Sequence, residues 1–430
     1  MTAPLKIGIA GLGTVGVGVF RALDENADGL SGRAGRALAV TAVSARDRGK
    51  DRGLSLDGVR WTGDALELAV DDDVDVVVEL IGGADGVAKD LVEAAIGAGK
   101  HVVTANKALI AHHGAALARM AEDAGVTLAY EASVAGGIPI VKSMREGLAG
   151  NRIDRVYGIL NGTCNYILTE MAGSGREFED VLAEAQAEGY AETDPSFDVD
   201  GVDTAHKLAI LASLAFGSEV DFDAVYTEGI RHVSPMDIEF AAELGYGIKL
   251  LGIASRTDGR IEQRVHPCMV PADAPINHVN GVFNAVVAEG DLVDTAIHEG
   301  RGAGAGPTAS AVVADLIDIA QGRTVPTFGI PAASLARLET IPMETHHGAY
   351  FVRFMVVDQP GVFAGIAASL QAHDVSMESV LQRGRDPGVP VPVVMTVHET
   401  EEAAMLRTLE EIAALDAVVE PPRMIRIEML

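Results

Sequence analysis

Basic side chains are scarce in this chain of 430 residues, which carries 33 lysines and arginines against 62 aspartates and glutamates, a net charge of -29. So negative a molecule repels phosphates, and nucleic acids and anionic membranes are therefore not expected as partners. For the same reason, a phosphate-bearing cofactor has to be held locally, by backbone N–H groups and a few arginines.

Cysteine is nearly absent as well, with Cys164 and Cys268 as the only two. Two cysteines cannot build a disulfide framework, and these lack metal-ligand spacing, so we expect core packing and a cytoplasmic protein. No apolar run is long enough to span a bilayer, and the first residues lack a signal-peptide layout. With 48% hydrophobic and 22% charged residues, the composition predicts a soluble globular protein of two or three domains.

Strand and helix patterns alternate through residues 1–130. The expected strands lie at 5–10, 39–44, 74–80, 101–104 and 126–130. Short apolar strands that alternate with helices predict an α/β fold, with a Rossmann-type, doubly wound parallel sheet.

The pattern changes after this first domain. Residues 131–302 mix longer helices with β-branched strands, which predicts an α+β domain on a mixed sheet that carries substrate binding and dimerisation. A helix within 303–322 is expected to return to the first domain, and prolines mark 323–345 as a linker. Residues 346–430 show a strand-helix-strand-strand-helix-strand order, which is the ferredoxin-like arrangement.

A nucleotide site is predicted where Gly11-x-Gly13-x-x-Gly16 follows a strand and opens a helix. The glycines allow a tight turn, and the helix N-terminus can hold a pyrophosphate. The cofactor-binding residues expected here are Gly11, Gly13, Thr14, Val15 and Gly16. After the second strand, Arg46 suits a 2′-phosphate, so NADP(H) is favoured; NAD(H) stays open because Asp47 is adjacent.

Asp203 and Lys207 lie one helical turn apart in front of the segment 208–216, which is apolar on every face. A helix without a polar face is usually buried, so both side chains are expected to enter the protein. The alternative is a surface ion pair worth a few tenths of a kcal/mol. A buried carboxylate and ammonium can orient and protonate a small polar substrate.

Two further segments carry chemistry. Lys107 comes just after a strand's carboxyl end, the edge that faces the ligand crevice in such sheets, although a solvated lysine is an equal alternative. The glycine-rich turn at 131–139 begins with Glu131 and can point several carbonyl oxygens inward, as hard cations prefer. From these residues alone, a hinge is favoured over a metal site.

Taken together, these motifs resemble homoserine dehydrogenases of the long bacterial type, which end in an ACT regulatory domain. The resemblance covers essentially the whole chain, and the order and spacing of its motifs are highly specific. The motifs are Gly-Leu-Gly-Thr-Val-Gly at 11–16, Thr-Ala-Asn-Lys at 104–107, Glu-Ala-Ser-Val-Ala-Gly-Gly-Ile-Pro at 131–139, Asn-Gly-Thr-Cys-Asn-Tyr-Ile-Leu at 161–168, Gly-Tyr-Ala-Glu-x-Asp-Pro at 189–195, Asp-Val-Asp-Gly-Val-Asp-Thr-Ala-His-Lys-Leu at 198–208 and Gly-Ala-Gly-Ala-Gly-Pro-Thr-Ala-Ser-Ala-Val at 302–312.

The resemblance implies reversible, NADP(H)-dependent reduction of L-aspartate 4-semialdehyde to L-homoserine, on the route to threonine, isoleucine and methionine. It implies Lys207 as the acid, Asp203 as a group that orders the substrate or a water, and Lys107 as an assistant at the cofactor. The residues it implies for substrate binding are Glu192, Asp198 and Thr163. It also places Gly304 near the nicotinamide, and a sodium or potassium ion at Glu131, Val134, Gly136 and Ile138.

The family resemblance further implies threonine as an effector at the ACT domain and a homodimer or homotetramer. Three alternatives stay open: a non-catalytic sensor of nucleotide and amino acid, another NADPH-dependent reductase of a small amino-acid aldehyde, and an ACT domain that only mediates oligomerisation. A sensor predicts loss of Lys107, Asp203 or Lys207, and all three are present.

Overall fold

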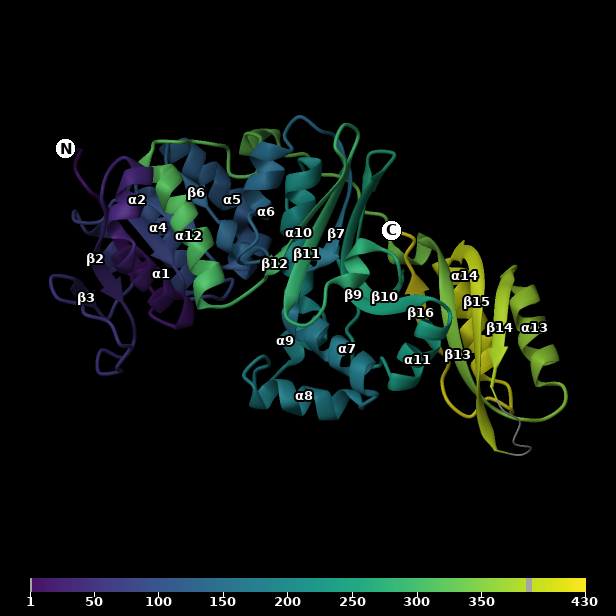
Figure 1. The fold of residues 1–430 in the computed structure, drawn as a ribbon. Coiled ribbons are helices and arrows are strands. Elements are labelled where there is room, and N and C mark those ends of the chain that lie inside the picture. Colours follow the sequence, from purple (N-terminus) through teal and green to yellow (C-terminus); the bar gives the residue numbers. More distant parts are fainter. Residues whose placement is uncertain (1, 384–388) are drawn as a thin grey trace.

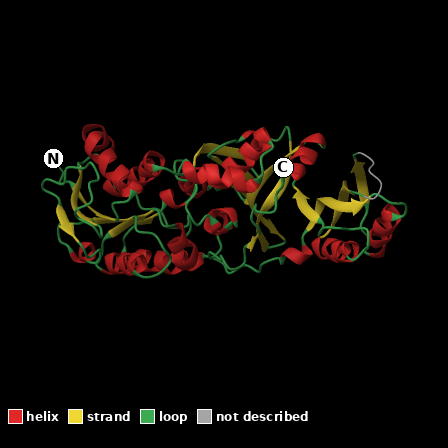
Figure 2. Ribbon diagram, turned by 90° about the horizontal axis from the view of Figure 1, so that it is seen from below, coloured by secondary structure: helices red, strands yellow, loops and turns green. Residues whose placement is uncertain are grey.

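The computed structural model of the protein describes residues 2–383 and 389–430. Three parts follow one another in a row (Figure 1): an amino-terminal parallel sheet with its helices, a central mixed sheet, and a carboxy-terminal unit at the far end. Seen from below, helices flank the strands along the whole length (Figure 2). Among the described helices, none combines the length and the apolarity that crossing a bilayer requires.

The first sheet is parallel throughout, and its strand order is β3-β2-β1-β4-β5-β6. Its strands are β1 (Leu5–Ala10), β2 (Leu38–Ser44), β3 (Arg60–Thr62), β4 (Val76–Glu79), β5 (His101–Thr104) and β6 (Leu128–Ala129). The order reverses between β1 and β4, and ligands of such sheets bind at the strands' carboxyl ends beside that point. This confirms the predicted Rossmann-type fold and places the glycine turn after β1 at the switch point.

Helices cover this sheet, and one of them comes from much later in the chain. They are α1 (Thr14–Glu25), α2 (Ala27–Ala34), α3 (Glu67–Val70), α4 (Val87–Gly97), α5 (Lys107–Ala124) and α12 (Ala305–Ala320). Helix α12 packs against α1 so closely that a Cβ on Gly18 would lie 2.7 Å from the Ala305 carbonyl oxygen. Helix α12 therefore lies with the helices of the first sheet, and Figure 1 shows it among the amino-terminal elements.

The central part is built on a mixed sheet. Its strands are β7 (Ile153–Ile159), β8 (Tyr226–Thr227), β9 (Tyr246–Thr257), β10 (Arg260–Pro271), β11 (Phe283–Gly290) and β12 (Asp294–Arg301). Its helices are α6 (Ile140–Lys142), α7 (Gly162–Ser174), α8 (Phe178–Ala187), α9 (Ser196–Val199), α10 (Val202–Phe216) and α11 (Pro235–Glu243). Helix α10 lies against β7, β9 and β10, and also contacts α5 of the first part. It therefore stands where the two sheets meet.

The carboxy-terminal unit has the predicted βαββαβ order. Its elements are β13 (His347–Val357), α13 (Val362–Ala372), β14 (Met377–Gln382), β15 (Pro390–Glu401), α14 (Glu402–Ala413) and β16 (Arg423–Ile427). The strand order β16-β13-β15-β14 is that of a ferredoxin-like sheet. Strand β16 also pairs in parallel with β10, at Cys268 and Met269, so the central and terminal sheets are continuous.

Candidate active site

Helix α10 carries its two charged residues into the interior, as predicted. Asp203 is 2% exposed and Lys207 is 8% exposed, and every residue from Leu208 to Ser213 is buried. The helix has no polar stripe to turn toward water, because sheet strands and helix α5 pack around it. The surface ion-pair alternative is therefore wrong.

One carboxylate joins two lysines at this place. Lys207 Nζ donates to Asp203 Oδ2 and to the Leu160 carbonyl oxygen, both at 2.7 Å. Lys107, the first residue of α5, forms an ion pair with the other Asp203 oxygen, Oδ1. Since α5 belongs to the nucleotide-binding sheet and α10 to the central part, the cluster spans the junction between the two.

Asn161 ties this cluster to a neighbouring carboxylate. Its Oδ1 caps α7 by accepting from the Cys164 N–H at 2.8 Å. Its Nδ2 donates to Asp203 Oδ2 and to Asp198 Oδ1, both at 2.8 Å. The polar turn at 161–165 therefore caps the helix and also orients two acidic groups.

The proximity of these charges shifts their protonation. Burial alone would raise the pKa of Asp203, but the charges and hydrogen bonds of Lys207 and Lys107 outweigh it and lower that pKa far below its usual range. Burial lowers the pKa of Lys207, and Lys107 adds to this while Asp203 opposes it. Burial, followed by the Asp203 charge, raises the pKa of Asp198. The cluster thus holds a permanently charged carboxylate beside an ammonium that gives up its proton more readily than an exposed lysine does.

Lys107 follows a hydrogen-bonded turn in which the sequence alone assigned no role to Asn106 or to Glu79. Asn106 caps α5 through the Leu109 N–H at 3.1 Å and donates to the Gly83 carbonyl at 2.7 Å. Glu79, completely buried at the end of β4, accepts from the Thr104 hydroxyl at 2.6 Å and from two N–H groups of the next loop. The sequence signal that could have identified Glu79 is an acidic residue at the carboxyl end of an apolar strand.

The three predicted substrate residues lie differently. Asp198 is half-buried on α9 and reaches the cluster through Asn161. Thr163 donates its hydroxyl to the Tyr190 carbonyl at 2.8 Å, in the loop before α9. Glu192 is exposed, and within residues 2–383 and 389–430 the structure records no contact between its side chain and the cluster. Phe197, which the sequence analysis missed, places its ring 5.2 Å from Lys107 Nζ.

The glycine turn has the shape that a dinucleotide requires. Gly11 has a φ of 99°, and a Cβ there would lie 2.5 Å from the Leu80 carbonyl oxygen; on Gly16 it would lie 2.0 Å from that of Gly11. Gly13 is different, because a Cβ on it would meet nothing within 4 Å. Packing within the protein therefore does not demand Gly13, and the room beside it fits a ligand's phosphates at the first turn of α1.

Three arginines, Arg46, Arg48 and Arg52, follow β2. Arg46 is exposed and forms no ion pair or hydrogen bond with any part of the chain that the structure describes. Arg52 donates to the Leu12 carbonyl at 3.1 Å and lies over the Trp61 ring, so it fixes the loop after β2 to the glycine turn. Asp47 accepts from the Gly49 N–H at 2.8 Å and is thereby turned into its own loop.

The turn that starts at Glu131 is buried and lacks a cationic partner among the described residues. The Glu131 oxygens accept from the Val141 and Lys142 N–H groups at 2.9 and 2.8 Å. Burial, and then the nearby Asp315 charge, raises the pKa of Glu131 to about 7. A carboxylate has about four lone-pair sites, so two remain for a cation.

The backbone of this turn is bent as an oxygen cage would need. Ala135 and Gly136 have φ angles of 53° and 44°, and a Cβ on Gly136 would lie 2.3 Å from the Gly302 carbonyl oxygen. The Ile138 carbonyl accepts from the Ile140 N–H at 2.8 Å, which leaves its second lone pair. Val134 is completely buried. Gly304, with a φ of 118°, caps α12 only two residues beyond Gly302.

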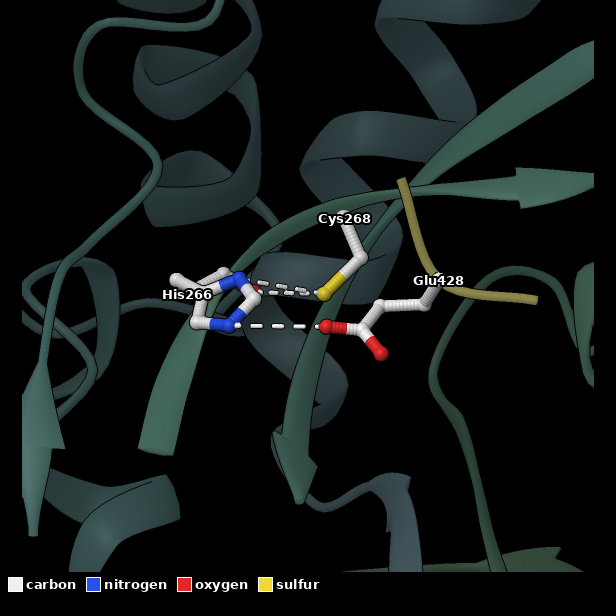
Figure 3. Close-up of side chains that lie close together, drawn as sticks. All are labelled: His266, Cys268 and Glu428. Atoms are coloured by element: carbon white, nitrogen blue, oxygen red, sulfur yellow. Dashed lines mark hydrogen bonds and ion pairs between the residues drawn. The ribbon is translucent and has the colours of Figure 1, made fainter. Parts of the chain in front are cut away.

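A second group of titratable side chains lies between β10 and the last residues of the chain. Figure 3 shows His266, Cys268 and Glu428, whose ligand atoms lie within 4.8 Å of one another. Both Glu428 oxygens accept from Arg264 Nη2, at 2.8 and 2.9 Å. Burial raises the pKa of the Cys268 thiol well above its usual value. Because the carboxylate is already paired and the thiol keeps its proton, we assign the group to anchoring the carboxy-terminal segment.

Comparison with known proteins agrees with this geometry. Two family models match: "Homoserine dehydrogenase, NAD binding domain" over residues 11–131 and "Homoserine dehydrogenase" over residues 139–317. The homoserine dehydrogenase of Pseudomonas aeruginosa is 46% identical over 434 residues, which cover 99% of each chain.

Solved structures give the same result. That of a homoserine dehydrogenase from Thiobacillus denitrificans has a TM-score of 0.93 at 43% identity and covers 99% of each chain. A hyperthermophilic archaeal homoserine dehydrogenase in complex with NADPH has a TM-score of 0.64 at 28% identity, covering 76% of this chain and 100% of its own. The chain therefore belongs to the homoserine dehydrogenase family and is an NAD(P)-dependent oxidoreductase.

Proposed function

We propose that the chain reversibly reduces L-aspartate 4-semialdehyde to L-homoserine with NADPH, and that Lys207 supplies the proton. The observation that carries this proposal is the buried Lys207 ammonium. Two of its three N–H groups donate hydrogen bonds, one to Asp203 and one to the Leu160 carbonyl. One N–H is left for a substrate oxygen. When bound, the nicotinamide supplies the hydride.

The surrounding residues follow from the charge that develops on the aldehyde oxygen. Hydride addition makes this oxygen negative, so a positioned ammonium both stabilises it and protonates it. Lys107 adds a second positive charge at the cofactor side, and Asp203 holds both lysines in place. Asp198, Thr163 and Glu192 hold the amino-acid end of the substrate; Glu192, now exposed, has to turn inward for this.

NADPH is favoured over NADH by the loop after β2. Arg46 is an exposed guanidinium with no partner among the described residues, whereas Asp47 is hydrogen-bonded within its own loop. An arginine at this point matches a 2′-phosphate. The archaeal family member, solved with NADPH, supports the same choice.

The turn at Glu131 is proposed to hold a sodium or potassium ion, with one carboxylate oxygen and the carbonyls of Val134, Gly136 and Ile138 as ligands. Support comes from the buried, unpaired charge of Glu131 and from the strained turn beside it. The ion would sit beside the 302–304 segment, so its role is to fix the junction rather than to take part in chemistry.

Each part of the chain is proposed to have its own role. Residues 1–130 with the helix in 303–322 hold the cofactor, residues 131–302 hold the substrate and dimerise, and 346–430 form an ACT domain joined by the 323–345 linker. Threonine is the proposed effector, at the loop of Asp358. The chain would act in the cytoplasm, as a homodimer or homotetramer, in threonine, isoleucine and methionine synthesis.

The decisive experiment follows NADPH oxidation with aspartate semialdehyde in wild-type, Lys207→Ala and Lys249→Met protein. Lys249 is a matched control, because it is also buried and also donates to a carbonyl, that of Val279 at 2.7 Å, yet it does not contact Asp203. Lys207→Ala is expected to lose about 10²–10⁴ in turnover with unchanged NADPH affinity. Near-normal turnover of Lys207→Ala, or an equal loss in Lys249→Met, contradicts the assigned role.

A further inference from the structure

Lys207 is held on one side by a carbonyl whose position depends on a side chain outside the cluster. The Leu160 carbonyl oxygen accepts from Lys207 Nζ at 2.7 Å and from Asn284 Nδ2 at 2.9 Å. Leu160 follows the last residue of β7, and Asn284 is the second residue of β11. The two strands pair up to Ala285 and Ile159, so the Asn284 amide continues their hydrogen bonding just beyond the last backbone pair.

Asn284 is a polar residue in a place where polarity is costly. It is 1% exposed, and in the part of the chain that the structure describes its Oδ1 has no hydrogen-bond partner. An unsatisfied buried oxygen of this kind costs about 1–3 kcal/mol. An apolar side chain of similar size would avoid this cost. The role of the amide is therefore its hydrogen bond to the Leu160 carbonyl, and not packing alone.

The same amide reaches the nucleotide side of the junction. A Cβ on Gly302 would stand 2.1 Å from Asn284 Nδ2, so the Asn284 carboxamide occupies the room of a missing side chain. Gly302 belongs to the short segment between β12 and α12, next to Gly304. Asn284 thus contacts both the anchor of Lys207 and the segment that opens the returning helix.

We propose that Asn284 is a positioning residue for proton transfer: it fixes the Leu160 carbonyl, and with it the direction of the Lys207 ammonium, relative to the segment at 302–304. The inference rests on the proposed role of Lys207. A lysine has a long flexible side chain, so its free N–H points at the substrate only while both of its acceptors are fixed. Asp203 is one fixed acceptor, and Asn284 makes Leu160 the other.

Three variants test this, with Lys207→Ala measured alongside. Asn284→Ala removes the amide, and Asn284→Asp keeps its shape but replaces the donor by a carboxylate. The control is Asn165→Asp, because Asn165 is equally buried and its side-chain amide also donates to backbone carbonyls, those of Val279 and Phe283 at 3.1 Å, but its side chain does not touch Asp203, Lys207 or Lys107. Each protein is assayed for kcat, for both KM values, for NADPH binding by fluorescence, and for kcat against pH.

Asn284→Ala is expected to lose about 10²-fold in kcat, as for a misplaced catalytic group, with unchanged NADPH affinity. In Asn284→Asp the added negative charge favours the protonated lysine, so the basic limb of kcat for reduction moves to higher pH. Asn165→Asp is expected to behave as wild type. Wild-type kcat in Asn284→Ala, or a loss in Asn284→Asp without movement of the limb, overturns the inference.

The proposed function and this inference fail separately. If Lys207→Ala keeps its turnover, the proposed function is wrong; if it loses turnover while both Asn284 variants do not, only the inference is wrong. Should Asn284→Ala not fold, Gly302→Ala decides, because its Cβ displaces the same amide from the other side. An unchanged kcat in Gly302→Ala then refutes the positioning role.

Discussion

Replacing Glu428 with alanine should weaken the attachment of β16 to the central sheet. Glu428 is the third residue from the end, and its side chain is 8% exposed against the 6% of Arg264, its partner. Among the described residues, Glu262 is then the one acidic partner left to Arg264, at 3.0 Å, and Glu262 also accepts from His346 at 2.8 Å. The buried Arg264 guanidinium then shares the Glu262 carboxylate with the His346 ring.

The magnitude follows from the burial. Removing one partner of a buried ion pair costs about 3–5 kcal/mol, and because Glu262 remains we expect the lower end, about 3 kcal/mol. Replacing both partners, in Arg264→Met with Glu428→Met, should restore most of that loss, since an apolar pair of similar volume is often as stable as the ion pair. The single loss and the double rescue together identify the pair as the cause.

The two ends of the molecule can be measured separately, because the one tryptophan of the sequence lies outside the carboxy-terminal unit. Trp61 is in β3, so its fluorescence during urea unfolding reports on the first sheet and should not change. Amide hydrogen exchange of β16 and β10 reports on the affected region, where the Glu428 N–H donates to the Met269 carbonyl at 2.9 Å. A cost in β16 below about 1 kcal/mol, or a double variant no better than Glu428→Ala, would refute the reasoning.

Three further outcomes are expected. Because burial lowers the pKa of Lys207, the rate of aldehyde reduction should fall with rising pH at a midpoint below the ordinary lysine value of 10.5, as a kcat–pH profile will show. Arg46→Ala should raise KM for NADPH about tenfold and leave KM for NADH unchanged, as steady-state kinetics with each cofactor will show. The folded-state pKa of Glu131 is about 7, above its unfolded value of 4.5, so without a cation stability falls as pH rises through this window. Potassium or sodium, compared with choline in thermal unfolding, should therefore stabilise wild type more at pH values above this window than below it, and Glu131→Gln should remove the difference.

The elements of the fold were largely predictable because burial leaves a clear pattern. Strands of a parallel sheet are covered on both faces, so β1 is apolar apart from Lys6, and β4 is apolar up to its last residue, Glu79. The pairing of β16 with β10 was not predicted. It involves only two residue pairs, Cys268 with Arg426 and Met269 with Ile427, and it depends on which strand edges meet in space. Periodicity within one segment carries no such information.

The candidate site shows the same limit. Asp203 and Lys207 are four residues apart on one helix, so their contact was predictable from spacing. Lys107 lies almost a hundred positions earlier, and only the packing of α5 against α10 brings it to Asp203. Asn284 carries no motif at all. A single asparagine near the start of a strand gives no signal until its neighbours are known.

The arrangement around Asp203 decides which group can move a proton. Three of the roughly four acceptor positions of this carboxylate are occupied, by Lys107, Lys207 and Asn161. Against the effect of burial, the two lysines lower its pKa far below its usual range, so it stays charged at every working pH and is a poor base. In the proposed reaction, the transferable proton therefore comes from a lysine. Of the two, Lys207 is the more buried, and burial weakens its hold on that proton.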